Sequence, residues 1–162
     1  MTCIAGRVAL LQQANSFPLE NYFQEGHGFG VNLGRTMPII ASRGCPYQCT
    51  FCSNPQMWTT RYVLRNVDDV IEEVKHYIEK YDITAVQLYD LTAIVKKRWI
   101  LEFLQKLIDN NINIQWDFPS GTRSEILDED VLALLKKTGT SYLCYAPESG
   151  STRMLKLIKK KM

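Results

Sequence analysis

The chain has 162 residues, of which 46% are hydrophobic and 22% charged, so it is long enough for one globular domain with a sizeable core and too apolar for a disordered segment. Its net charge of +2 favours neither a nucleic-acid partner nor a membrane partner. An odd count of five cysteines, no apolar run near the ~18 residues of a membrane span and no visible signal peptide predict a reduced, cytoplasmic protein.

The chain begins with a weakly patterned segment, residues 1–37, which we expect to form a lead-in packed against the rest. From residue 38 onward, short apolar runs predict strands at 38–42, 83–89, 112–118 and 141–146. Apolar residues at helical spacing and end signals predict helices at 67–78, 99–108, 129–138 and 151–160. Asn66 and Asp128 can cap two of these helices, and Gly139 stands where a glycine commonly ends one.

These elements alternate as four βα units of roughly 30 residues each. Such alternation predicts an α/β fold with a parallel sheet and right-handed crossover helices. A partial parallel barrel and a doubly wound sheet share this order of elements, and periodicity does not separate them. In a barrel, the reactive groups lie on the loops that follow the C-terminal ends of the strands.

Three cysteines, Cys45, Cys49 and Cys52, form a C-x3-C-x2-C run in the loop after the first predicted strand. Thiolates this close can converge on one centre, and thiolate sulfur is the soft ligand that iron–sulfur clusters and zinc select. No fourth cysteine or histidine follows at a matching spacing, which indicates a cluster with one iron left open. A zinc site completed by His27 or Cys144 is the alternative, although structural zinc sites usually use paired C-x2-C motifs.

This spacing, with the aromatic Phe51 directly before the last cysteine, resembles the cluster loop of the radical S-adenosylmethionine (radical SAM) superfamily. The resemblance implies that Cys45, Cys49 and Cys52 hold a [4Fe–4S] cluster, whose open iron chelates the methionine part of S-adenosylmethionine (SAM). It also implies reductive cleavage of SAM to a 5′-deoxyadenosyl radical, with a reductant such as flavodoxin or ferredoxin. Tyr47 and Phe51 flank the cluster ligands and are expected to belong to the cofactor site, with Phe51 on the adenine side.

Two further motifs follow predicted strands, where a barrel presents ligand groups. Asp90 follows the second strand, and the resemblance implies that its carboxylate accepts a hydrogen bond from the amino group of SAM. Glu148, Ser149 and Gly150 follow the fourth strand and resemble the segment that reaches the ribose and carboxylate of SAM. From the residues alone, Asp90 is equally a turn or cap residue, and the segment 148–150 could simply begin the last helix.

Segments 120–125, 127–139 and 145–151 are similar to the cobalamin-binding branch of the superfamily, which includes anaerobic magnesium-protoporphyrin IX monomethyl ester cyclases and radical methyltransferases. Leu91 departs from that branch, because a second acidic residue is usual there. The family core has six βα units, whereas this chain is predicted to have four. The resemblance therefore implies a partial parallel (β/α) barrel, with residues 38–162 as a core truncated at its C-terminus and cobalamin possible in the longer family context.

These features predict a radical SAM enzyme core that acts on a small-molecule substrate, in a cobalamin-dependent methyltransferase or cyclase. Two alternatives stay open. An iron–sulfur electron-transfer module would need a fourth cysteine near the three. A zinc-stabilised binding module would carry no catalysis.

Overall fold

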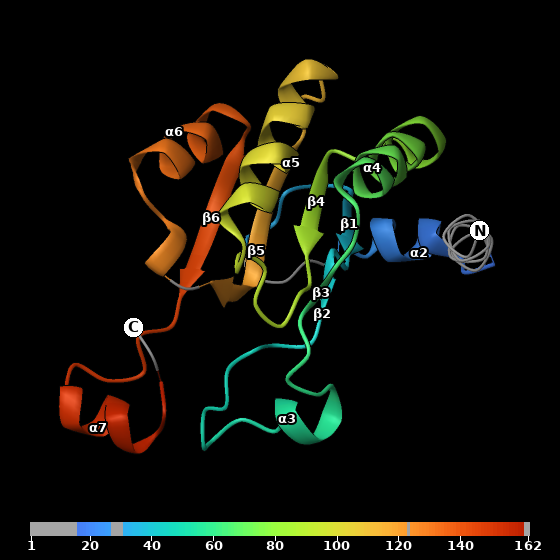
Figure 1. Ribbon diagram of the computed structural model, residues 1–162. Coiled ribbons are helices and arrows are strands. Elements are labelled where there is room, and N and C mark those ends of the chain that lie inside the picture. The colour runs from blue at the N-terminus through green and yellow to red at the C-terminus, as the bar shows by residue number, and fades with distance from the viewer. Residues whose placement is uncertain (1–15, 27–30, 123, 161–162) are drawn as a thin grey trace, which may run out of the picture.

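A parallel sheet of four strands lies at the centre of the molecule (Figure 1). The computed structural model describes residues 16–26, 31–122 and 124–160. The strands are hydrogen-bonded in the order β1 (Thr36–Ile39), β4 (Ala85–Leu88), β5 (Gln115–Thr122) and β6 (Thr140–Tyr145). Neighbours in the sheet follow one another along the chain, as in a barrel wall, whereas a doubly wound sheet reverses its strand order at a switch point. The predicted α/β class and partial parallel barrel are confirmed.

Three helices pack against one face of this sheet: α4 (Val67–Tyr81), α5 (Lys97–Asp109) and α6 (Glu129–Lys137) (Figure 1). Side chains alternate along a strand, so Val86 and Leu88 of β4 and Trp116 and Phe118 of β5 point to the same face. All four are buried in one core with the apolar stripes of the helices. The ring of Phe103 on α5 lies edge-on to Trp116 with centroids 5.4 Å apart. This core holds the strands in place and so fixes the positions of their C-terminal ends.

The predicted N-terminal ends of α4 and α6 are confirmed. The side chain of Asn66 accepts a hydrogen bond from the N–H of Asp68 at 2.8 Å, and that of Asp128 accepts from the N–H of Val131 at 3.2 Å. Gly139 has φ +87°, and a Cβ there would lie 2.8 Å from a backbone oxygen of the segment that leads into β5. Only glycine fits that close approach without strain.

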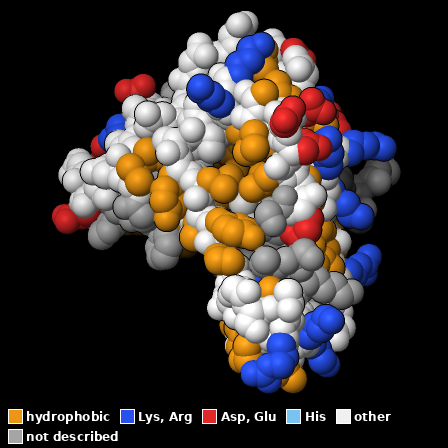
Figure 2. All heavy atoms as spheres, turned by 90° about the vertical axis from the view of Figure 1, so that its left-hand side faces the viewer, with side chains coloured by type: hydrophobic (Ala, Val, Ile, Leu, Met, Phe, Trp, Pro, Cys, Tyr) orange, Lys and Arg blue, Asp and Glu red, His pale blue; other side chains and the backbone are white. Residues whose placement is uncertain are grey.

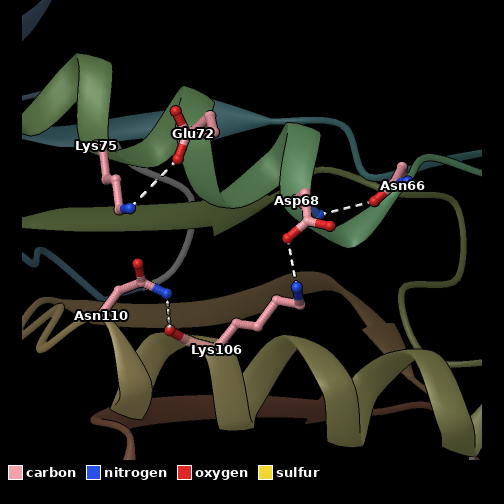
Figure 3. Close-up of polar contacts among 6 residues, drawn as sticks. All are labelled: Asn66, Asp68, Glu72, Lys75, Lys106 and Asn110. Carbon is pink, nitrogen blue, oxygen red and sulfur yellow. Dashed lines mark hydrogen bonds and ion pairs between the residues drawn. The ribbon is translucent and has the colours of Figure 1, made fainter.

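Polar contacts lie on the surface of α4 and α5, and one of them links the two helices (Figure 3). The ammonium of Lys106 pairs with the carboxylate of Asp68, and Asn110 Nδ2 donates to the carbonyl oxygen of Lys106 at 2.7 Å. Lys75 and Glu72 form a further pair on α4, with Nζ and Oε1 3.2 Å apart. Exposed ion pairs contribute roughly 0–1 kcal/mol each, so the buried apolar stripes dominate the packing of these helices.

Several predicted boundaries differ from the structure by a few residues, and two of the differences change the local structure. The strand expected at 38–42 ends at Ile39, and the next two-residue strand, β2 (Ser42–Arg43), leaves the main sheet to pair antiparallel with β3 (Val63–Leu64). The last helix, expected at 151–160, is the shorter α7 (Thr152–Leu157). Lys159 has a left-handed backbone with φ 53°, which an α-helix cannot continue through.

The remaining elements are short: α2 (Leu19–Gln24), α3 (Asn54–Met57) and the 3-10 helix η1 (Ser124–Ile126). The guanidinium of Arg35 connects α2 to the sheet, because it pairs with Glu20 at 2.9 Å and donates from Nε to the carbonyl of Tyr81 at 3.0 Å. Of the predicted lead-in 1–37, residues 1–15 and 27–30 lie outside the described residues, and the division at residue 37 stays a prediction. Within the described part of the chain, no helix is long and apolar enough to cross a membrane.

Candidate functional site

The cysteine loop, which we define as residues 44–53, lies beyond the C-terminal ends of the sheet strands, between β2 and α3 (Figure 1). Helix α7 lies at the same end of the molecule. The loop and the segment before α7 therefore meet where parallel barrels present their reactive groups. One backbone hydrogen bond joins the loop to the turn after α7, from the N–H of Thr50 to the carbonyl of Ile158 at 3.0 Å.

The three predicted cluster ligands are thiols in this loop, and none of them is in a disulfide. Cys45 and Cys49 are half-buried, and Cys52 is exposed. Within the described residues, no three side chains of His, Cys, Asp or Glu lie close enough together to hold a metal ion. The three thiols would therefore have to move closer together to bind a cluster. The donor set fits a [4Fe–4S] cluster with an open iron, since it supplies three soft thiolates from one short segment.

The other proposed thiol and imidazole ligands lie elsewhere. Cys144 is half-buried on β6, with its Sγ packed against the backbone at Gly121, where a Cβ would lie 3.9 Å from that sulfur. His27, the alternative zinc ligand, is outside the described residues.

Both ends of the cysteine loop are held by close backbone contacts. Gly44 has φ +78°, and a Cβ there would lie 2.1 Å from the carbonyl oxygen of Arg61, so no larger residue fits without displacing the backbone at Arg61. At the other end, the buried side chain of Asn54 donates from Nδ2 to the carbonyls of Cys45 at 3.2 Å and Thr59 at 3.4 Å. These contacts fix the loop's two ends next to each other.

Asp90 lies below the base of the loop and is 1% exposed. One carboxylate oxygen accepts from the N–H of Ala41 at 3.1 Å, and the other accepts from both the N–H and the hydroxyl of Ser42. Burial raises the pKa of the Asp90 carboxyl above its usual range, and the hydrogen bonds from Ser42 and Ala41 oppose that shift. The contacts that the structure gives to Asp90 thus anchor the backbone just before the cysteine loop, and its contact with SAM stays a prediction.

Tyr62, the residue directly before β3, supports the same region. Its hydroxyl lies 3.4 Å from the carbonyl oxygens of Thr92 and Ala93, in the segment after β4. Burial raises the pKa of Tyr62 to about 12, so the phenol stays protonated at neutral pH and acts as a hydrogen-bond donor.

The two aromatic residues of the predicted cofactor site differ in exposure. Phe51 is 55% exposed, and Tyr47 is half-buried. An exposed ring at Phe51 is able to cover a ligand bound at the loop. Its adenine contact and the role of Tyr47 stay predictions.

Glu148, Ser149 and Gly150 connect β6 to α7. Glu148 has φ 64°, and its Oε1 lies 3.2 Å from Nζ of Lys160. The hydroxyl of Ser149 accepts from the N–H of Ser151 at 3.1 Å. These contacts shape the turn into α7, and the ribose and carboxylate contacts expected of this segment are not tested by them.

Sequence reasoning missed a buried polar pair on the face of the sheet opposite the helices. Gln87 of β4 and Asp117 of β5 are adjacent in register and fully buried, and Gln87 Nε2 donates to Asp117 Oδ2 at 3.1 Å. The other oxygen of Asp117 is buried without a hydrogen-bond partner. Burial raises the pKa of the Asp117 carboxyl, and the bond from Gln87 opposes the shift. The polar side chains alternating with apolar ones in both strands were the signal available in the sequence.

Residues 39–162 match the model of the Radical SAM superfamily, and the chain belongs to this superfamily. It is 30% identical over 150 residues to cytidylyl-2-hydroxyethylphosphonate methyltransferase of Streptomyces wedmorensis, a match that covers 89% of this chain and 27% of the relative. It is 25% identical over 130 residues to anaerobic magnesium-protoporphyrin IX monomethyl ester cyclase of Rubrivivax gelatinosus, covering 80% of this chain and 23% of the cyclase. The predicted resemblance to radical SAM methyltransferases and cyclases is confirmed.

Among solved structures, the fold is similar to the radical S-adenosylmethionine methyltransferase TsrM from Kitasatospora setae. With tryptophan substrate and a SAM analog bound, that enzyme matches with a TM-score of 0.65 and 18% identity, over 84% of this chain and 24% of TsrM. With cobalamin and a [4Fe–4S] cluster bound, it matches with a TM-score of 0.56 and 21% identity, over 75% of this chain and 21% of TsrM. The matched part makes up only about a quarter of the length of the two curated relatives, the methyltransferase and the cyclase.

Proposed function

We propose that the chain forms the [4Fe–4S]- and SAM-binding core of a radical SAM enzyme, with Cys45, Cys49 and Cys52 as cluster ligands. The observation that carries the proposal is the presence of three reduced thiols in one loop at the C-terminal edge of a parallel sheet, in a chain of this superfamily. When bound, the cluster supplies one electron, received from a reductant such as flavodoxin or ferredoxin, that breaks the sulfonium S–C5′ bond of SAM and leaves methionine and the 5′-deoxyadenosyl radical.

The protein's own contribution is to hold the ligands and to exclude water. Gly44 and Asn54 fix the two ends of the loop next to each other, so the three thiolates come from one closed segment. The segment 148–150 reaches the same end of the sheet and leads into α7, and the turn after α7 contacts the loop through Thr50. This proximity supports assigning the carboxylate of Glu148 and the hydroxyl of Ser149 to the polar groups of SAM, with Gly150 leaving space beside them.

The role of Asp90 is narrower than the resemblance implies. A carboxylate has about four acceptor sites, and Ala41 and Ser42 occupy three of them with their donors. A hydrogen bond from the amino group of SAM would have to use the remaining site. We therefore assign Asp90 first to anchoring the loop and second to SAM.

The reaction class is proposed from the relatives. A methyltransferase and a cyclase match most of this chain, and the structurally similar TsrM has been solved with both cobalamin and a [4Fe–4S] cluster. We propose that this chain serves a methyltransferase or cyclase reaction on a small-molecule substrate. Cobalamin, if used, would be bound in a longer polypeptide, as this methyltransferase and this cyclase are more than three times as long as their matched part.

The test is spectroscopic. The protein is purified without oxygen, reconstituted with iron and sulfide, reduced, and examined by EPR with and without SAM. We expect a [4Fe–4S]⁺ signal that changes shape when SAM is added, because SAM binds to the open iron. Cys49→Ser should lose the cluster, whereas Cys144→Ser, which removes a thiol from β6, should retain it.

Each other outcome contradicts part of the proposal. A cluster whose signal ignores SAM would favour an electron-transfer module. Zinc without a cluster would favour a structural binding module and overturn the proposal altogether. Loss of the cluster in both cysteine variants would show that Cys144 is a fourth ligand and that no iron is open.

A further inference from the structure

A cleft of about 880 Å³ lies between the cysteine loop and α7. Its walls come from two segments that are more than one hundred residues apart along the chain. The described lining residues are Pro46, Tyr47 and Gln48 of the loop, and Thr152, Leu155, Lys156, Lys159 and Lys160 of α7 and the turn after it. A volume of this order is typical of small-molecule sites, which span roughly 300–1,000 Å³.

The cleft is positively charged. Three of its described lining residues are lysines and none is acidic, although the whole chain carries a net charge of only +2. Lys160 is neutralised by Glu148 at 3.2 Å, and its side chain is 13% exposed. Lys156 and Lys159 are exposed. Figure 2 shows Lys and Arg side chains gathered on the lower lobe of the molecule, at the end where α7 lies in Figure 1.

The backbone at Lys159 is strained. Lys159 donates its N–H to the carbonyl of Lys156 at 3.2 Å, and Lys160 donates to that of Leu155 at 2.9 Å, which is the hydrogen-bond pattern of a Schellman motif. The residue in the left-handed position of this motif is usually glycine or asparagine, because a larger side chain is disfavoured there. Lysine at φ 53° therefore lowers stability, and Lys159 is one of the residues that line the cleft. Strain of this kind is concentrated at functional sites.

The lining also suits an organic ligand rather than a bare ion. Pro46, Tyr47 and Leu155 supply apolar and aromatic surface, and Gln48 and Thr152 supply hydrogen-bonding groups. We propose that this cleft binds the substrate of the enzyme through an oxyanion group, a phosphate, phosphonate or carboxylate, held by Lys156 and Lys159. The apolar part of the substrate then packs on Tyr47 and Leu155, beside the cysteine loop. This inference rests on the proposed function, since it takes the cysteine loop to be the reactive centre.

Phenyl phosphate, which joins an oxyanion to an aromatic ring, is a suitable probe. Its binding to the whole 162-residue protein is measured by calorimetry and by NMR, without cluster or SAM. We expect saturable binding that weakens as salt is added, because the contact is electrostatic. Phenol, which has the ring without the phosphate, should bind at least tenfold more weakly.

The decisive variant is Lys159→Gly. Glycine relieves the left-handed strain, so the variant should be at least as stable as the native protein, yet it should bind phenyl phosphate about tenfold more weakly because one charged contact is lost. Lys156→Gln should weaken binding by a similar factor. Lys136→Gln removes the same charge from an exposed position on α6 and should leave binding unchanged.

Several results would overturn the proposal. These are no saturable binding of phenyl phosphate, equal binding by the native protein and Lys159→Gly, or equal weakening by Lys136→Gln, which would indicate non-specific charge attraction. SAM is the other source of an oxyanion, through its carboxylate. If SAM competes with phenyl phosphate on the protein without cluster, the cleft belongs to SAM and the substrate assignment is wrong. Since the probe needs no cluster, failure of this test is distinct from a failure to assemble the [4Fe–4S] centre.

Discussion

Asp90 offers the sharpest test of how the cysteine loop is built. Its carboxylate, Ala41 and Ser42 are each at most 3% exposed, and the carboxylate accepts three hydrogen bonds from those two residues. Asp90→Ala leaves two backbone N–H groups buried without acceptors. Each such group costs about 1–3 kcal/mol, so the free energy of unfolding should fall by about 2–6 kcal/mol.

Asp90→Asn is the more informative variant because it keeps the shape of the side chain. If the amide oxygen faces Ser42, the amide nitrogen faces the N–H of Ala41, where two donors oppose each other. One hydrogen bond is lost, and the free energy of unfolding should fall by about 1–3 kcal/mol. Urea unfolding followed by circular dichroism measures this change. Asp109→Asn, at an exposed site on α5, should stay within about 0.5 kcal/mol of the native protein.

The same variant separates the two roles of Asp90. If Asp90 anchors the loop, the Asp90→Asn protein should contain less iron and sulfide after reconstitution, while the cluster that does form still responds to SAM in the EPR spectrum. If Asp90 instead binds SAM, Asp90→Asn should leave stability and cluster content unchanged and abolish the response of the EPR spectrum to SAM. The second pattern would refute the anchoring role of Asp90 and restore the contact implied by the family resemblance.

Three further substitutions test the surrounding structure. Gly44→Ala places a Cβ 2.1 Å from the carbonyl oxygen of Arg61 at φ +78°, and should destabilise the protein by about 2–5 kcal/mol in urea unfolding. Asn54→Ala removes the hydrogen bond to the carbonyl of Cys45, and should lower stability by about 1–2 kcal/mol and speed loss of iron to a chelator. Burial raises the pKa of Asp117, so the folded chain binds a proton at this carboxyl more tightly than the unfolded chain does. The contribution of Asp117 to the free energy of unfolding therefore falls as the pH rises through the raised pKa. Asp117→Asn should remove that fall and raise stability near neutral pH by about 1 kcal/mol, as measured by urea unfolding at acidic and neutral pH.

The sequence was sufficient for the elements that local signals control. Helices α4 and α6 begin at the caps expected from Asn66 and Asp128, because a side-chain acceptor and an apolar stripe are both visible in a short window. The four strands alternate with helices as expected, and the position of the cysteines after the first predicted strand placed their loop at the C-terminal ends of the strands. The choice between a barrel and a doubly wound sheet needed the strand order, which depends on contacts between distant segments.

Three of the missed features depend on such distant contacts. The strand predicted at 38–42 is interrupted because Asp90, 48 residues further along, accepts the N–H of Ser42 that a continuous strand would have used. The spacing of apolar residues in 151–160 predicted a helix, but it did not predict that this helix would lie against the cysteine loop. The buried partner of Gln87 was likewise hidden, because Asp117 becomes its neighbour only through the register of β4 and β5.

The cysteine loop is held unequally at its two sides, and this leads to a prediction for hydrogen exchange. At its base, the N–H groups of Ala41 and Ser42 are buried and bound to Asp90. Near its tip, one backbone bond joins the exposed Thr50 to Ile158. Amides at the base should therefore exchange only on large-scale unfolding, whereas the Thr50 amide should exchange through a local opening that is far less costly. Hydrogen exchange followed by NMR measures both, and cluster assembly should slow exchange at Thr50 much more than at Ser42. Equal protection of the two amides before cluster assembly would contradict a loop anchored at its base and open at its tip.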